Sequence, residues 1–281
     1  MYDQRKIKDM LFFVFVLSVS IIALTLMLHI IFVTLSNGIP VILRAGLGFF
    51  TSIPPTPLSK NIGGIAPALA GSFIMTLASL PVSVSLAFFS AVLTTEFPRN
   101  PLSIVIDVVA KSLASIPTIV VSMVIYLIVV VPMGKFSALA GVLALTIISL
   151  PYSYTYISTY LRSIPATYRE AAYSIAMSRW RMIISVFVPI IRRGLLITVS
   201  MTSARILGET AAILFVTGRY RLGVSVSLLD PTDAVPLLIF DYMLTPYKNF
   251  QEISWAAASL LLLSYLIIFT TTKFLVKGVK L

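Results

Sequence analysis

The feature that most constrains this chain is a series of long apolar runs that contain no charged residue. Three of them span residues 10–35, 65–95 and 136–161. Each exceeds the roughly 20 residues that a helix needs to cross a bilayer. The first run is also longer than the roughly 7 to 15 apolar residues of a signal peptide, and no small-residue cleavage pattern follows it, so we expect a retained first span. The runs predict an all-α polytopic membrane protein.

Composition supports this class of protein over the alternatives. Charged residues make up only 11% of the chain, whereas soluble proteins contain roughly 25%. The net charge of +11 could indicate nucleic-acid binding, but the Lys and Arg residues lie mainly in short segments beside the apolar runs, as in a membrane protein. We therefore expect lipid, and no nucleic acid, around this chain. It contains no Cys, which excludes disulfides and Cys-ligated metals.

Three further apolar segments bring the expected number of transmembrane helices to six. The third span runs from about residue 102 to 131 and is interrupted at Pro117; the fifth runs from about Gly194, or from as early as Met182, to Val216; and the sixth covers residues 253–272. Four longer segments lie outside the spans: the N-terminus (1–9), an outer loop rich in Gly and Pro (36–64), an Arg-rich loop (162–193) and a polar outer loop (217–252). Short turns join the remaining spans. One membrane domain is expected.

The distribution of basic residues predicts the orientation. Thirteen Lys and Arg residues lie in the N-terminus, the 96–101 turn, the 162–193 loop and the C-terminus. Six lie in the segments on the other side, which are 36–64, 132–135 and 217–252. Basic residues favour the cytoplasmic side of a membrane. We therefore expect the protein in the inner (cytoplasmic) membrane, with both termini and the Arg-rich loop facing the cytoplasm.

Two short helices are expected within the Arg-rich loop. Pro165 suits the first position of one helix, and Ser178 can cap a second helix that begins at Arg179. Two such helices meeting at an angle would form a compact knob for another protein to bind. From these residues alone, an ordinary cytoplasmic loop is as good an interpretation.

The motifs along the chain carry a resemblance to a known family. Glu170-Ala171-Ala172, followed by Ala176, Trp180 and Val188-Pro189, resembles the E-A-A loop of ABC importer permeases. Together with this loop, an ordered set of further motifs resembles the PstA-type permeases of phosphate importers: Gly63-Gly64-Ile65 with Pro67-Ala68-Leu69, Ile106-Asp107, Ile116-Pro117-Thr118-Ile119-Val120, Leu139-Ala140-Gly141, Arg205-Ile206-Leu207-Gly208-Glu209-Thr210-Ala211 and Trp255-Ala256-Ala257. The resemblance runs from about Asn61 to the C-terminus and implies a type I ABC permease domain over residues 65–281.

The resemblance also implies partners and an energy source. Such a permease pairs with a second, PstC-like permease, two PstB-like ATPase subunits and a PstS-like extracytoplasmic phosphate-binding protein. ATP would be used by the ATPase, while this chain would bind no cofactor or metal and would not itself be an enzyme; in agreement, it has no phosphate-cradling G-x-x-x-x-G-K-[ST] loop and no H-E-x-x-H motif. The family's coupling loop corresponds here to Arg169, Glu170, Ala171, Ala172 and Ala176.

One residue of this loop departs from the family pattern. The family has Gly where this chain has Ala176. If that position requires a positive φ, Ala costs about 1 kcal/mol relative to Gly. Either the turn is therefore formed differently here, or the helix continues through it.

Two charged residues in the fifth apolar segment form the candidate substrate pathway. Arg205 and Glu209 are four residues apart, which predicts that they share one helix face. A charge in this part of a span costs about 2.5 to 3.5 kcal/mol, so both side chains are expected to face the bundle interior. They either neutralise each other, or Arg205 presents its donors to a passing oxyanion while Glu209 orients it. The resemblance, in which such a pair is associated with phosphate passage, favours the second interpretation.

Other assignments remain open beside the phosphate permease. A permease for another oxyanion, such as molybdate or sulfate, would have the same architecture. An ion-coupled transporter without an ATPase would need more intramembrane carboxylates than Asp107 and Glu209, and an intramembrane enzyme would need a nucleophile and base or a metal set that the chain lacks. Asp107 and Lys111, at i,i+4 spacing, are interpreted as a local pair that anchors the third span.

Overall fold

The computed structural model describes residues 2–59 and 61–278, and the fold is almost entirely helical. Met1, Lys60 and residues 279–281, which belong to ranges discussed above, lie outside these residues. Within the described ranges no strand forms, and one isolated bridge joins Gly218 and Thr232. The elements are α1 (Tyr2–Ala45), α2 (Gly48–Thr51), α3 (Ala66–Glu96), α4 (Pro101–Ser115), α5 (Thr118–Ile125), a π-helical turn (Tyr126–Val130), α6 (Val131–Met133), α7 (Ala138–Arg162), α8 (Ala166–Ser174), α9 (Arg179–Met182), a second π-helical turn (Ile183–Phe187), α10 (Val188–Leu207), α11 (Val235–Met243) and α12 (Lys248–Gly278).

The helices confirm the predicted all-α membrane class. Five are long and apolar enough to cross a membrane: α1, α3, α7, the continuous helix from Arg179 to Leu207, and α12. A sixth span results if the bent pair formed by α4 and the α5–α6 segment is counted as one. The fifth span has the expected early start, which lies at Arg179 and so three residues before Met182, because α9, the π-helical turn and α10 form one continuous helix.

The expected interruption of the third span at Pro117 is a sharp bend and not a mild kink. The helix axis turns by 105° between α4 and α5. Proline disfavours the α conformation of the residue before it, and Ile116 is extended with φ −74° and ψ 129°. Pro81 and Pro151, in contrast, lie inside α3 and α7 without ending them.

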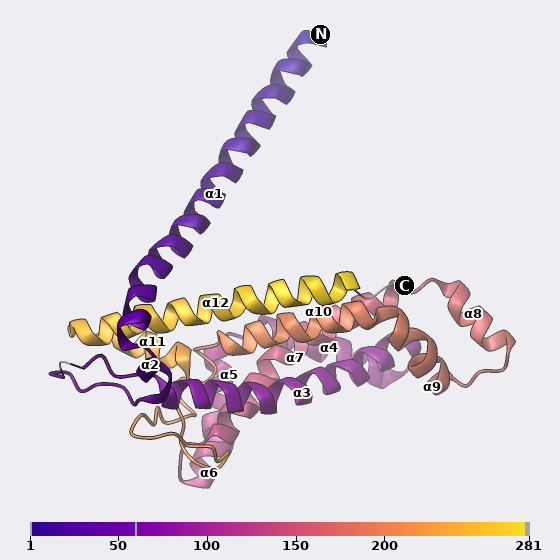
Figure 1. Cartoon of the computed structure of the whole chain (residues 1–281). Coiled ribbons are helices and arrows are strands. Elements are labelled where there is room, and N and C mark those ends of the chain that lie inside the picture. The colour runs from indigo at the N-terminus through magenta and orange to yellow at the C-terminus, as the bar shows by residue number, and fades with distance from the viewer. Residues whose placement is uncertain (1, 60, 279–281) are drawn as a thin grey trace.

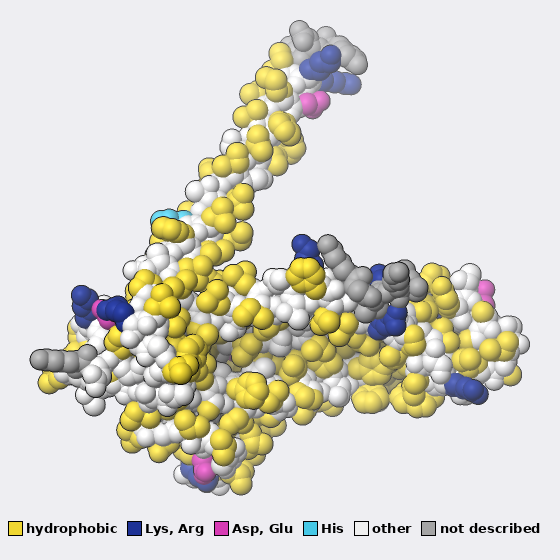
Figure 2. Space-filling model, in the orientation of Figure 1, with side chains coloured by type: hydrophobic (Ala, Val, Ile, Leu, Met, Phe, Trp, Pro, Cys, Tyr) yellow, Lys and Arg dark blue, Asp and Glu magenta, His cyan; other side chains and the backbone are white. Residues whose placement is uncertain are grey.

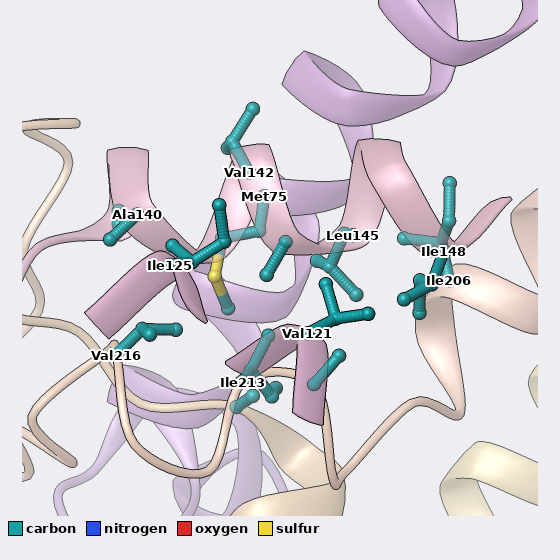
Figure 3. Close-up of a cluster of buried hydrophobic side chains, with 14 of the residues drawn as sticks. Met75, Val121, Ile125, Ala140, Val142, Leu145, Ile148, Ile206, Ile213 and Val216 are labelled. Carbon is teal, nitrogen blue, oxygen red and sulfur yellow. The ribbon is translucent and has the colours of Figure 1, made fainter. Parts of the chain in front are cut away.

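The bundle is built around the pairing of α3 with α7. Along this interface Gly141 lets the two helices approach closely, because a Cβ at this position would lie 2.5 Å from the sulfur of Met75. Ser149 Oγ donates to Ser83 Oγ across the interface at 2.9 Å. Small residues and hydroxyl pairs of this kind hold helices together in lipid. Helix α10 packs on both helices, α12 packs on α10, and a cluster of apolar side chains from α3, α5, α7 and the end of α10 fills one part of the interior (Figure 3).

Helix α1 is longer than the first apolar run predicted. It continues to Ala45, so the expectation of an irregular loop from residue 36 is wrong for ten residues. This last part packs against α12, where Val41 is buried and Ser259 Oγ donates to the Thr34 carbonyl oxygen at 2.7 Å. The preceding part projects from the bundle as an arm, exposed from Arg5 to Ile30, with an apolar surface and charged side chains at its free end (Figures 1 and 2).

The segment between α10 and α12 is ordered by ion pairs and contains a helix of its own, α11. Arg221 donates to Asp233 through Nε at 2.6 Å and to Asp241 through Nη2 at 2.7 Å. Burial opposes the charge of Arg221, but the hydrogen bonds and charges of the two carboxylates outweigh it and hold the pKa of Arg221 above its ordinary value. This network lies at the end of the bundle that also holds α2; α8 lies at the opposite end (Figure 1).

The contact between α1 and α12 depends on Gly38. A Cβ at this position would lie 2.0 Å from Ser259 Oγ and 2.2 Å from the Trp255 carbonyl oxygen. We expect Gly38→Val to lower the free energy of unfolding by about 1 to 3 kcal/mol, as overpacked interfaces do. Thermal unfolding of the purified protein in detergent measures this change.

The matched control is Gly48→Ala in α2. A Cβ there meets only Ser52 Oγ, at an ordinary 3.6 Å, so the free energy of unfolding should change by no more than about 0.5 kcal/mol. Equal stability of the two variants would contradict the close α1–α12 contact.

Candidate functional site

Arg205 lies two residues before the end of α10 and faces α7. Its guanidinium carbon is 3.7 Å from the centre of the Tyr152 ring. The Nε atom is buried without a hydrogen-bond partner, and among the described residues Arg205 forms no ion pair. A cation on an aromatic face gains electrostatic attraction without a counter-charge. Arg205 is thus held against a ring and not by a carboxylate.

Glu209 does not share a helix face with Arg205, so the predicted geometry of this pair is wrong. Helix α10 ends at Leu207, nine residues before the predicted end at Val216. The next residue, Gly208, has no side chain, and the hydroxyl of Tyr265 packs against it. A Cβ at this position would lie 2.0 Å from that oxygen. Glycine also weakens helix continuation. Beyond it, Glu209 Oε1 accepts a hydrogen bond from the Ala212 N–H at 3.4 Å, within a series of tight turns.

The structure brings Glu209 into a different environment from that of Arg205. Its side chain lines a small pocket with hydroxyl and apolar groups of α3, α7 and the segment before α11. Lining residues include Ser72, Thr76 and Leu145. Glu209 therefore neither neutralises nor orients Arg205 by an ion pair in this structure.

Polar neighbours of Arg205 on α7 and α10 were not found from the sequence. The hydroxyls of Ser153 and Thr202 lie 2.7 Å apart in a buried hydrogen bond between the two helices. Tyr152 and Ser153 follow Pro151 directly within the uncharged fourth run. In the sequence these two residues stand out only as polar side chains inside an apolar run. That pattern does not indicate that they contact residues of α10.

At the opposite end of the continuous helix, α8 ends in a Schellman cap. The Met177 N–H donates to the Ala172 carbonyl oxygen at 3.0 Å, and the Ala176 N–H donates to the Tyr173 carbonyl oxygen at 2.9 Å. Ala176 itself has φ 54°, the left-handed conformation in which glycine is usual. The helix does not continue through this residue, and the turn is the one that a Gly would form.

The predicted second helix is confirmed, and the first begins one residue later than expected. Ser178 Oγ accepts from the Arg181 N–H at 3.4 Å and caps α9, which begins at Arg179. Pro165 is the residue before α8 and has an extended backbone.

The coupling-loop residues divide into an exposed and an inward-facing group. Glu170, Ala171 and Ala176 are exposed. Ala172 is buried, and Arg169 points toward Glu96 at the end of α3, with Nη2 2.8 Å from Oε1. The Arg169–Glu96 contact could not be predicted from the sequence, because the two residues are 73 positions apart.

A second charged cluster joins α4 to the bundle. Lys111 Nζ donates to Asp107 Oδ2, which confirms the predicted i,i+4 pair. Tyr154 donates to the other oxygen of Asp107 at 2.9 Å, so the pair is also tied to α7. Within the described ranges, no group of three or more His, Cys, Asp or Glu side chains could hold a metal ion.

The left-handed conformation of Ala176 predicts opposite effects of two Ala→Gly changes. Ala176→Gly should stabilise the α8 cap by about 1 kcal/mol, because an L side chain is strained at this φ. Ala171→Gly, within α8, should destabilise the helix by about the same amount. Amide hydrogen exchange of α8 measures both: slower exchange is expected in the first variant and faster exchange in the second. Faster exchange in both variants would contradict the strained turn.

A family model matches most of the chain. Residues 62–281 match the family described as "Binding-protein-dependent transport system inner membrane component". A probable phosphate transport system permease protein PstA of Methanocaldococcus jannaschii is 32% identical over 273 residues, which cover 97% of this chain and 95% of the relative. A phosphate transport system permease protein PstA of Xylella fastidiosa is 34% identical, covering 83% of this chain and 80% of the relative.

Solved structures share the fold. A chain of the MetNI methionine ABC transporter in an inward-facing conformation matches with a TM-score of 0.57 at 18% identity, covering 77% of this chain and 93% of that chain. A chain from an amino acid ABC transporter matches with a TM-score of 0.57, covering 76% and 92%. The matched range, the relatives and the shared fold agree: the chain belongs to the family of inner membrane components of binding-protein-dependent transport systems.

Proposed function

We propose that this chain is the permease subunit of an ATP-driven ABC importer for inorganic phosphate and forms half of its translocation pathway. The phosphate permeases among its relatives, which align with it over most of their length, support this substrate. A PstC-like permease would supply the other half. Two PstB-like subunits would hydrolyse ATP, and a PstS-like protein would deliver phosphate. The chain itself would carry no cofactor or metal and catalyse no reaction.

In this proposal, the α8 end of the bundle faces the cytoplasm and the α11 end faces outward. The excess of basic residues in the segments that include α8, the N-terminus and the C-terminus supports this orientation, with both termini inside. The ordered segment around Arg221 and α11 would then meet the phosphate-binding protein, and the exposed face of α8, with Glu170 and Ala171, would dock on the ATPase.

The observation that carries the proposal is the unpaired guanidinium of Arg205. A partly buried cation that merely stabilised the fold would be expected to have a carboxylate partner. Arg205 has instead the ring of Tyr152, which contacts its flat face. The N–H donors lie around the edge of the guanidinium, in a fork that matches an oxyanion. Arg205 would therefore bind phosphate briefly, and the buried hydrogen bond between Ser153 and Thr202 would hold α7 and α10 together beside it.

A permease for another oxyanion is the second candidate, since Arg205 offers the same donors to sulfate or molybdate. The phosphate permeases among the relatives favour phosphate. Uptake of labelled phosphate in the presence of excess sulfate or molybdate separates the two: inhibition by either anion comparable to that by unlabelled phosphate would favour the second candidate.

The role of Arg205 predicts loss of transport in Arg205→Gln. Charged hydrogen bonds contribute about 1.5 to 3 kcal/mol, so phosphate uptake by the assembled importer should fall by about tenfold or more. Tyr152→Phe keeps the aromatic face and should transport near the wild-type rate. Phosphate uptake by proteoliposomes, with complex assembly checked by co-purification, measures both. Normal uptake by an assembled Arg205→Gln complex would exclude the proposed role.

The docking role of α8 predicts that Glu170→Arg weakens binding of the ATPase. Glu170 is exposed, so the reversal should leave the fold of α8 unchanged and alter only its contact surface. The yield of ATPase that co-purifies with the permease should fall severalfold. Glu252→Arg makes the same reversal at the other end of the bundle, where Glu252 pairs with Arg44, and should not change that yield. Equal loss in both variants would argue against α8 as the docking surface.

A further inference from the structure

Arg169 joins four elements at one guanidinium. Its Nη2 donates to Glu96 Oε1 at 2.8 Å, and its Nε lies 3.3 Å from both carboxylate oxygens. Nη1 donates to the Ile164 carbonyl oxygen at 3.0 Å, just beyond α7, and Nη2 also reaches the Leu161 carbonyl oxygen at 3.4 Å. The guanidinium carbon lies 4.9 Å from the ring centre of Phe187, in the π-helical turn before α10. One side chain of α8 thus contacts α3, α7 and the start of α10.

Glu96 occupies a position that is unfavourable without this partner. It is the last residue of α3, where the helix dipole disfavours a negative charge. Its side chain is only 3% exposed, and Arg169 is its one ion-pair partner among the described residues. Burying a carboxylate in this way requires a fixed counter-charge. The same arginine also bonds to the carbonyl oxygens of Leu161, in the last turn of α7, and of Ile164, just beyond it.

Few other contacts hold α8 to the bundle. Figure 1 shows α8 beyond the ends of the long helices. Of its side chains, Ala172 is buried in the cluster formed by α3, α7 and the α9–α10 helix, and Met177 of the following turn packs against that cluster. A displacement of α8 therefore reaches α3 mainly through Arg169 and this small apolar contact, and it reaches α7 both through Arg169 and through the three-residue connection 163–165.

Helix α7 continues this route to the candidate substrate site. Tyr152 lies nine residues before Leu161 on α7, about 14 Å along the axis. Its ring contacts Arg205 at 3.7 Å, and the adjacent Ser153 is hydrogen-bonded to Thr202 of α10. The end of α7 held by Arg169 is thus joined by a rigid helix to the residue that positions Arg205.

We propose that the Glu96–Arg169 pair is the link that transmits movement of α8 to the ends of α3 and α7. Arg169 is then a positioning residue for the coupling of ATP hydrolysis to transport and does not itself contact the ATPase. This inference rests on the proposed function. An ion pair with a buried carboxylate and several further hydrogen bonds resists separation, so α8, α3 and α7 move together when a docked ATPase moves α8. The exposed face of α8, with Glu170, remains free for docking.

The test uses the assembled importer in proteoliposomes, with inorganic phosphate and ATP. Glu96→Gln keeps the shape of the side chain and removes its charge. We expect the ATPase to co-purify normally and to hydrolyse ATP, while the phosphate transported per ATP hydrolysed falls by about tenfold, within the usual range of coupling between sites. The double reversal Glu96→Arg with Arg169→Glu restores opposite charges and should recover part of that ratio.

Lys135→Gln provides the matched control. It removes the ion pair with Asp230, at 3.2 Å, far along the chain from α8, and should leave the ratio unchanged. A normal ratio in an assembled Glu96→Gln importer, or loss of the ATPase from that variant, would overturn the inference. If the wild-type chain itself brought no ATPase with it, the proposed function would fail first.

A second measurement needs no change at the pair. Because the chain has no Cys, cysteines introduced at exposed Ser174 of α8 and exposed Arg99, just after α3, can be spin-labelled alone. The distance between the two labels should be the same in the ATP-free and ATP-bound importer, since the link keeps α8 and the end of α3 together. A distance that changes between the two states would overturn the inference independently of the result with Glu96→Gln.

Discussion

The need to satisfy backbone hydrogen bonds inside lipid governs this structure. Helices meet that need along their whole length, so each place where a span stops being helical requires a local explanation. Two such places matter here. Pro117 turns the third span by 105°, and Gly208 ends α10 against the hydroxyl of Tyr265. Arg205 lies three residues before the second break. The departure from regular structure and the unpaired charge thus occur together, as is common at functional sites.

The sequence predicted features that depend on neighbours along the chain. The apolar runs, the interruption at Pro117, the cap at Ser178 and the pair of Asp107 with Lys111 all follow from local chemistry or helical spacing. The extension of α1 to Ala45 could not be predicted, because a Gly- and Pro-rich sequence was stabilised as helix by packing on α12.

Contacts between distant segments account for the remaining differences. Helical spacing put Arg205 and Glu209 on one face, but that inference assumed that the helix continues. The helix ends instead at Leu207, just before Gly208, against which a tyrosine of α12 packs. The same limit applies to the Glu96–Arg169 pair, whose members look like unrelated loop charges in the sequence. Ala176 differs: the sequence reduced the alternatives to two, and only the backbone could decide between them.

Three partly buried arginines differ in the partners of their guanidinium groups. Arg169 and Arg221 each contact at least one carboxylate and hold segments together at opposite ends of the bundle. Arg205, between them, has an aromatic ring and no carboxylate. A fixed counter-charge would compete with a passing anion, whereas a ring orients the guanidinium and leaves its charge available. The two paired arginines tie segments of the scaffold together, and in the proposed function this would let Arg205 keep the orientation in which it meets an anion.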